Sequence, residues 1–154
     1  MPFKDPIRPD IENVRAGERW NDGGLILTAT DFQNGLKIGR FAQIKNGIQL
    51  ANLDGSSTTL VAGVALRSVV NPIESGDSYD AEIHREAEYK REGLVTVEVV
   101  GGVTPKIFDK CYAVNSVGND SGKATGVPIS TVDVNAEFIQ EVQTGVWLVN
   151  LKGA

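Results

Sequence analysis

The chain has 154 residues, enough for one domain with a sizeable core, and 41% of them are hydrophobic. Its formal net charge of −5 argues against binding to nucleic acid or to anionic membranes, since both favour clustered lysine and arginine. A single cysteine, Cys111, excludes an internal disulfide framework, and no apolar run approaches the roughly 20 residues of a membrane span.

Residues 1–23 are predicted to form an extended N-terminal arm, followed by a β-domain over residues 24–154. Three of the six prolines lie near the start of the arm: Pro2, Pro6 and Pro9. Proline restrains the backbone toward extended geometry. Apolar residues recur between the charged ones: Phe3, Ile7, Ile11 and Val14. A frayed terminus remains the alternative, although it needs no such regular apolar residues.

From Gly24 onward, short apolar runs alternate with turn residues, which is typical of strands. Residues 24–30 and 59–70 form two such runs. Between them, two further runs flank Asn46-Gly47, a dipeptide that favours a tight hairpin turn. This part of the chain therefore predicts several short antiparallel strands.

Residues 93–102 alternate clearly, with valines on one face and Thr96 and Glu98 on the other. Residues 79–91 are ambiguous, because their alanine and glutamate content favours helix while their neighbours are all β-like. We favour a strand there. One helical turn is expected over residues 104–110, with Thr104 as the N-cap and a proline at the first position.

The last two strands are predicted to form a hairpin around a three-residue loop, Gln143-Thr144-Gly145. The final strand is apolar on both faces, with Trp147 on one and Leu148 on the other, so both faces should be covered. The prediction is an all-β fold: a compact β-sandwich or partly open, β-tulip-like barrel with one or two short helices and an extended N-terminal arm.

The sequence offers no catalytic, cofactor or metal site. His84 is the only histidine and lies in a charged run, which predicts a solvated side chain, and Cys111 precedes an apolar strand. The segment GNDSGKATG, from Gly118, lacks the spacing of a phosphate-binding loop. We therefore expect no enzyme.

Five stretches together resemble the capsid cement, or head decoration, proteins of tailed bacteriophages. They are LKIGRFAQI (36–44), AGVALRSV (62–69), EGLVTVEV (92–99), KIFDKCYAVN (106–115) and AEFIQEVQTGVWLVNL (136–151). Their order and spacing cover most of the chain after the arm.

The resemblance implies a virion protein on the outer surface of an expanded icosahedral head. It implies a homotrimer that clamps the major capsid protein at threefold and quasi-threefold junctions against the pressure of packed DNA. The implied place of synthesis is the bacterial host cytoplasm, and the start of the chain lacks the apolar run of a signal peptide.

Within this reading, the arm residues Phe3, Ile7 and Ile11 are candidate capsid contacts, with Trp20 as an anchor where the arm joins the body. The alternative is a β-module of a phage tail or fibre that binds a saccharide or a host surface. That alternative predicts that Trp20 and Trp147 are both exposed on one concave face, because sugar rings stack on aromatic side chains.

Overall fold

The computed structural model describes residues 14–18, 20, 22–67, 77–102 and 104–153. This part of the chain forms strands and contains no helix. The strands are β1 (Leu25–Ala29), β2 (Leu36–Lys37), β3 (Phe41–Lys45), β4 (Gln49–Asn52), β5 (Val61–Ala65), β6 (Ser78–Tyr79), β7 (Ala87–Glu98), β8 (Lys110–Val114), β9 (Ala124–Thr125), β10 (Thr131–Gln143) and β11 (Val146–Lys152). Among the same residues, no helix is long and apolar enough to cross a membrane.

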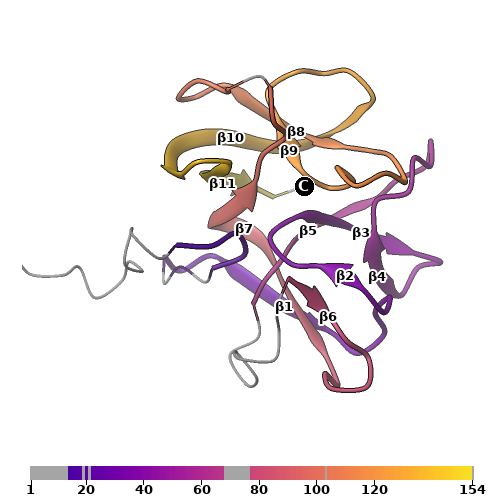
Figure 1. Ribbon diagram of the computed structural model, residues 1–154. Coiled ribbons are helices and arrows are strands. Elements are labelled where there is room, and N and C mark those ends of the chain that lie inside the picture. Colours follow the sequence, from indigo (N-terminus) through magenta and orange to yellow (C-terminus); the bar gives the residue numbers. More distant parts are fainter. Residues whose placement is uncertain (1–13, 19, 21, 68–76, 103, 154) are drawn as a thin grey trace, which may run out of the picture.

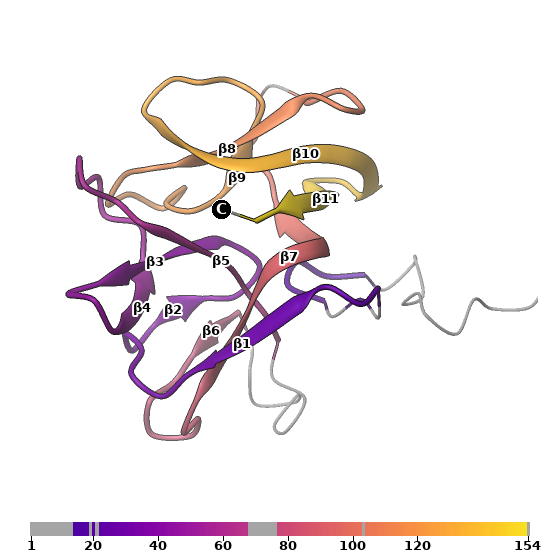
Figure 2. The same ribbon diagram turned by 180° about the vertical axis from the view of Figure 1, so that it is seen from behind.

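Most strands join one strongly curled antiparallel sheet (Figures 1 and 2). The order is β4-β3-β5-β7-β11-β10-β8-β9, with β1 also beside β7, while β2 and β6 form a small second sheet. Val99, just past β7, bridges to Ala124 of β9. The last strand of the order therefore lies beside the end of the central strand β7, and the sheet partly closes on itself. The fold is therefore a partly open barrel, which confirms the all-β prediction.

Strand β7 joins the two halves of the molecule. Its first half pairs with β1 and β5, and residues from Glu92 to Glu98 pair with β11. Gly93 lies at the junction with a φ of 101°. A Cβ there would lie 2.6 Å from the carboxylate of Asp22 and 3.0 Å from the Cα of Gly24. Glycine is needed at this point because the backbone is left-handed and the N-terminal segment approaches closely.

Two apolar cores fill the fold. The larger includes Phe41, Leu66, Val95, Val97, Cys111, Phe138, Trp147 and Val149. The smaller includes Leu36, Ile38, Leu50, Tyr79 and Ala87. Trp147 is 5% exposed and its ring meets that of Phe138 edge-on at 5.5 Å, while Leu148 on the opposite face is 7% exposed. Both faces of the closing strand are thus covered, as its sequence predicts.

Both predicted hairpins are present, but the loop of the closing hairpin is shorter than predicted. Asn46 and Gly47 both have positive φ, at 54° and 81°, and they connect β3 to β4. In the closing hairpin Gln143 pairs directly with Val146, so the loop has two residues instead of the expected three. Gly145, at φ 78°, supplies the left-handed position that the turn requires.

The predicted helical turn over residues 104–110 is wrong. The backbone N–H of Asp109 donates to the carbonyl of Lys106, but Phe108 has a φ of 69°, which a right-handed helix does not allow. The N–H of Phe108 and the carbonyl of Asp109 bond instead to the backbone of Phe138 in β10. Pairing with a neighbouring strand therefore overrides the local helix signal.

Residues 79–91 are strand at their two ends and turn between them. Tyr79 ends β6, Ala87 begins β7, and residues 80–86 form a turn. Asp80 organises this turn, since its carbonyl accepts from the N–H groups of Ile83 and His84. The preference for strand is correct for β6 and β7 and wrong for the segment between them.

Candidate functional site

The N-terminal strap, which we define as residues 14–18, 20 and 22–24, lies along one edge of β7. The hydrogen bonds of residues 15–18 of the strap to β7 are made with Thr96, which is fully buried. The N–H of Gly17 donates to the Thr96 carbonyl at 2.7 Å, and the Thr96 hydroxyl donates to the carbonyl of Arg15 at 2.7 Å. The strap explains why Thr96, predicted on the polar face of its strand, is buried.

The strap also buries its own apolar side chains. Val14 is fully buried, and Ala16 and Trp20 are each 8% exposed. The part of the predicted arm from residue 14 onward therefore packs on the β-domain. Phe3, Ile7 and Ile11 lie outside the described residues, so their contact with a capsid stays a prediction, as does any capsid contact of Trp20.

A buried ion pair fastens the end of the strap. Lys90 is fully buried in β7, and its Nζ lies 2.5 Å from Asp22 Oδ1 and 3.1 Å from the carbonyl oxygen of Trp20. Asp22 also accepts the backbone N–H groups of Gly24 and Leu94. Burial acts to raise the pKa of Asp22, but the bonds from Lys90, Leu94 and Gly24 outweigh it and hold the pKa below its ordinary value.

We expect the contribution of Asp22 to stability to disappear in acid. A carboxylate with a lowered folded pKa gives its full stabilisation above the unfolded value of about 3.9 and loses it as the pH falls through the lower folded value. The measurement is urea unfolding from about pH 7 down to about pH 3. Asp22→Asn should be less stable at neutral pH and should lose less stability on acidification. Parallel pH profiles for the two proteins would contradict this role.

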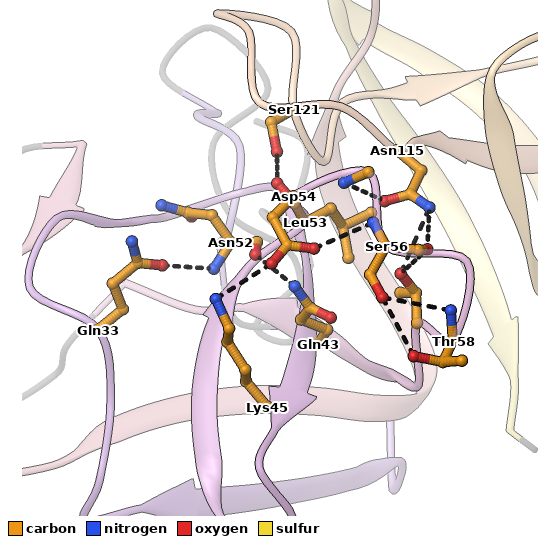
Figure 3. A network of polar contacts seen from close by, with 12 residues as sticks. Gln33, Gln43, Lys45, Asn52, Leu53, Asp54, Ser56, Thr58, Asn115 and Ser121 are labelled. Carbon is orange, nitrogen blue, oxygen red and sulfur yellow. Dashed lines mark hydrogen bonds and ion pairs between the residues drawn. The ribbon is translucent and has the colours of Figure 1, made fainter.

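A polar network holds the loop between β4 and β5, and Figure 3 shows its members. Asp54 Oδ2 lies 3.1 Å from Lys45 Nζ, and Asp54 Oδ1 accepts the backbone N–H of Ser56 at 3.1 Å. Hydrogen bonds from Gln43, Lys45 and Ser56 lower the pKa of Asp54. The carboxylate is thus committed to bonds within the protein.

The same network ties this loop to the segment between β8 and β9 (Figure 3). Asn115 Oδ1 accepts the N–H of Gly55 at 2.9 Å, and Asn115 Nδ2 donates to the carbonyl of Ser56 at 3.0 Å. The hydroxyl of Ser121 donates to the carbonyl of Leu53. Because these groups bond to one another, the arrangement braces two loops and presents no free catalytic group.

His84 and Cys111 occupy different cores. Cys111 is fully buried in the larger core, and burial raises the pKa of its thiol well above the ordinary value. His84 is 5% exposed and packs edge-on against Tyr79 of the smaller core, with ring centres 4.8 Å apart. The prediction of a solvated histidine is therefore wrong: the turn over residues 80–86 folds it inward.

The described residues contain no group of three or more histidine, cysteine, aspartate or glutamate side chains that could hold a metal ion. The described residues also include large exposed hydrophobic side chains, most of which lie in loops. They are Leu25, Ile48, Leu60, Ile83, Ile107, Phe108, Val117 and Ile129. Exposed apolar side chains on loops are a common feature of protein-binding surfaces. Sequence reasoning missed Ile107 and Phe108, because a helical turn was expected there.

Comparison with known proteins identifies the family of the chain. The profile of the XM1 gp53 minor capsid protein family matches residues 13–152. A chain in a solved structure, "The capsid of Myoviridae Phage XM1", superimposes with a TM-score of 0.85 and 31% sequence identity, covering 99% of this chain and 98% of that one. Comparison with curated proteins gave no significant match. The chain therefore belongs to the XM1 gp53 minor capsid protein family and is a bacteriophage capsid protein.

Proposed function

We propose that the protein is a cement protein of an icosahedral phage head. It binds the outside of the expanded shell as a homotrimer, over threefold and quasi-threefold junctions of the major capsid protein. There it clamps neighbouring subunits against the outward pressure of packed DNA. No enzymatic step is part of this role.

The observation that carries the proposal is similarity along the whole length to a chain of the phage XM1 capsid. Two features of this molecule agree with it. The net charge of −5 suits a surface that must not bind DNA. The strap is bonded to the middle of the sheet, so a segment held by the capsid would be joined directly to the rigid body.

The saccharide-binding alternative loses its main support. Trp20 is 8% exposed and Trp147 is 5% exposed, so neither indole is free to stack on a sugar ring. The Nε1 of Trp147 also donates to Glu141 at 3.1 Å, which fixes its orientation.

The test of this role uses expanded heads that lack the protein. Purified protein is added, and the temperature at which the heads release their DNA is measured with and without it. A cement protein should co-sediment with the heads and raise that temperature. Absence of binding, or binding with an unchanged release temperature, would contradict the proposal.

Deleting residues 2–13 should leave a folded body that binds heads more weakly. The deletion stops before Val14, which is fully buried, so the strap and its bonds to β7 are retained. If the arm makes capsid contacts, a trimer presents three arms, and linked contacts can raise avidity by roughly 10²–10⁴. The measurement is head co-sedimentation over a concentration series, with circular dichroism as the folding control. Equal occupancy for both proteins would assign attachment to the body alone.

A further inference from the structure

The turn from Lys106 to Asp109, in the loop leading into β8, displays two apolar side chains at its tip. Ile107 is 59% exposed and Phe108 is 71% exposed. Among the described residues, no other large exposed hydrophobic side chain has another directly beside it in the sequence. A buried proline, Pro105, precedes the turn and fixes its base.

The turn is held rigidly from both sides. Within it, the N–H of Asp109 donates to the Lys106 carbonyl at 3.0 Å, and the N–H of Lys106 donates to Asp109 Oδ2 at 2.9 Å. Toward β10, the N–H of Phe108 donates to the Phe138 carbonyl at 2.7 Å, and the N–H of Phe138 donates to the Asp109 carbonyl at 2.9 Å. The tip is therefore preorganised, which lowers the entropy cost of binding through it.

Phe108 also occupies a strained backbone conformation. Its φ is 69°, whereas the other described non-glycine residues with positive φ are small and polar: Asn46, Ser130 and Asn135. A left-handed conformation costs a bulky residue stability, and glycine or asparagine would fit better. Because the ring is mostly exposed, it gives little core packing in return. Backbone strain at an exposed aromatic residue indicates that its side chain serves contact with another molecule and not stability of the fold.

We propose that Ile107 and Phe108 form an apolar anchor that inserts into an apolar pocket on a shell subunit of the capsid. Aromatic residues set in pockets are typical binding hot spots. The shell is the partner that the comparisons support, because both the family and the similar solved chain belong to a phage capsid. The anchor is too small to hold any partner by itself. One aromatic side chain buries only about 150–250 Å², while a stable interface buries about 800 Å² per partner. The anchor therefore needs a partner that the protein also holds elsewhere, and in this respect the inference rests on the proposed function.

The test compares Phe108→Gly with two matched controls. Glycine removes the ring and also relieves the backbone, so this variant should unfold about 2–4 °C higher than the wild type while binding heads about tenfold or more weakly. Asn46→Gly places glycine at another left-handed, exposed position without removing an apolar group. Ile48→Ser removes an apolar side chain that is 69% exposed, in the turn between β3 and β4, which lie at the opposite end of the strand order from β8. Both controls should bind heads like the wild type.

The measurements are head co-sedimentation, thermal unfolding and sedimentation velocity of the free protein. Weaker head binding by Phe108→Gly alone, with unchanged oligomeric state, is the expected result. Unchanged head binding by Phe108→Gly, with normal binding by the wild type, would overturn the anchor and leave the proposed function intact. A changed oligomeric state with unchanged head binding would assign the tip to a second copy and likewise overturn it. Failure of the wild type to bind heads would overturn both proposals.

Discussion

Replacing Trp147 with alanine is expected to lower the free energy of unfolding by about 3–5 kcal/mol, as a large-to-small change in a packed core. The indole is 5% exposed and lies edge-on to Phe138 at 5.5 Å. Its neighbours belong to a continuous sheet, which limits how far they can collapse into the space left behind. Urea unfolding followed by circular dichroism measures the change.

The controls separate lost packing from other effects of substitution. Trp147→Phe keeps an aromatic ring against Phe138 but loses the hydrogen bond to Glu141, so it should cost much less than alanine. Val117→Ala changes a residue that is 83% exposed and should alter stability by less than about 0.5 kcal/mol. An unfolding midpoint of Trp147→Ala equal to that of the wild type would show that the ring is not part of the core.

Lys90→Ala is expected to cost about 3 kcal/mol, because it leaves the Asp22 carboxylate without its cation in a partly buried place. The Nζ of Lys90 also bonds to the carbonyl of Trp20, so the substitution frees the end of the strap as well. The strap should then become accessible to protease before the rest of the fold opens. Urea unfolding and limited proteolysis measure the two effects.

A surface ion pair supplies the matched control. Lys152 pairs with Glu137 at 3.3 Å, but its side chain is 49% exposed, so Lys152→Ala should cost less than about 1 kcal/mol. A double variant, Lys90→Met with Asp22→Asn, removes both charges and should be more stable than Lys90→Met alone. If Lys90→Ala and Lys152→Ala cost the same, the buried pair does not fasten the strap.

Turns and strands that depend on neighbouring residues alone could be predicted from the sequence. Asn46-Gly47 predicts its turn because both residues accept positive φ. The closing strand predicts its own burial because Trp147 and Leu148 are apolar on opposite faces. The helix signal of Thr104-Pro105 fails for a non-local reason, since the backbone that follows bonds to Phe138, which lies 30 residues later in the chain.

The contacts of the strap could not be predicted from the sequence, because they join residues far apart in the chain. Lys90 stands in a charged run, where an exposed lysine is the ordinary expectation. Its partner Asp22 is 68 residues away in the sequence, and no local pattern joins the two. Alternation places Thr96 with Glu98 on the face opposite the valines, yet Thr96 is fully buried and bonds to a segment 81 residues before it. Such contacts depend on the completed fold.

The central place of β7 sets the order in which the chain can fold during its synthesis. The strap and β1 leave the ribosome first, but their bonding partners in β7 follow 81 residues later for Arg15 and Thr96, and 68 residues later for Asp22 and Lys90. At about 5–20 residues per second, this delay is on the order of 10 seconds. The second half of β7 must then wait again for β11. Folding of this sheet is therefore a late event in which earlier segments assemble around one strand, and the bond from Lys90 to the Trp20 carbonyl cannot form until β7 is made.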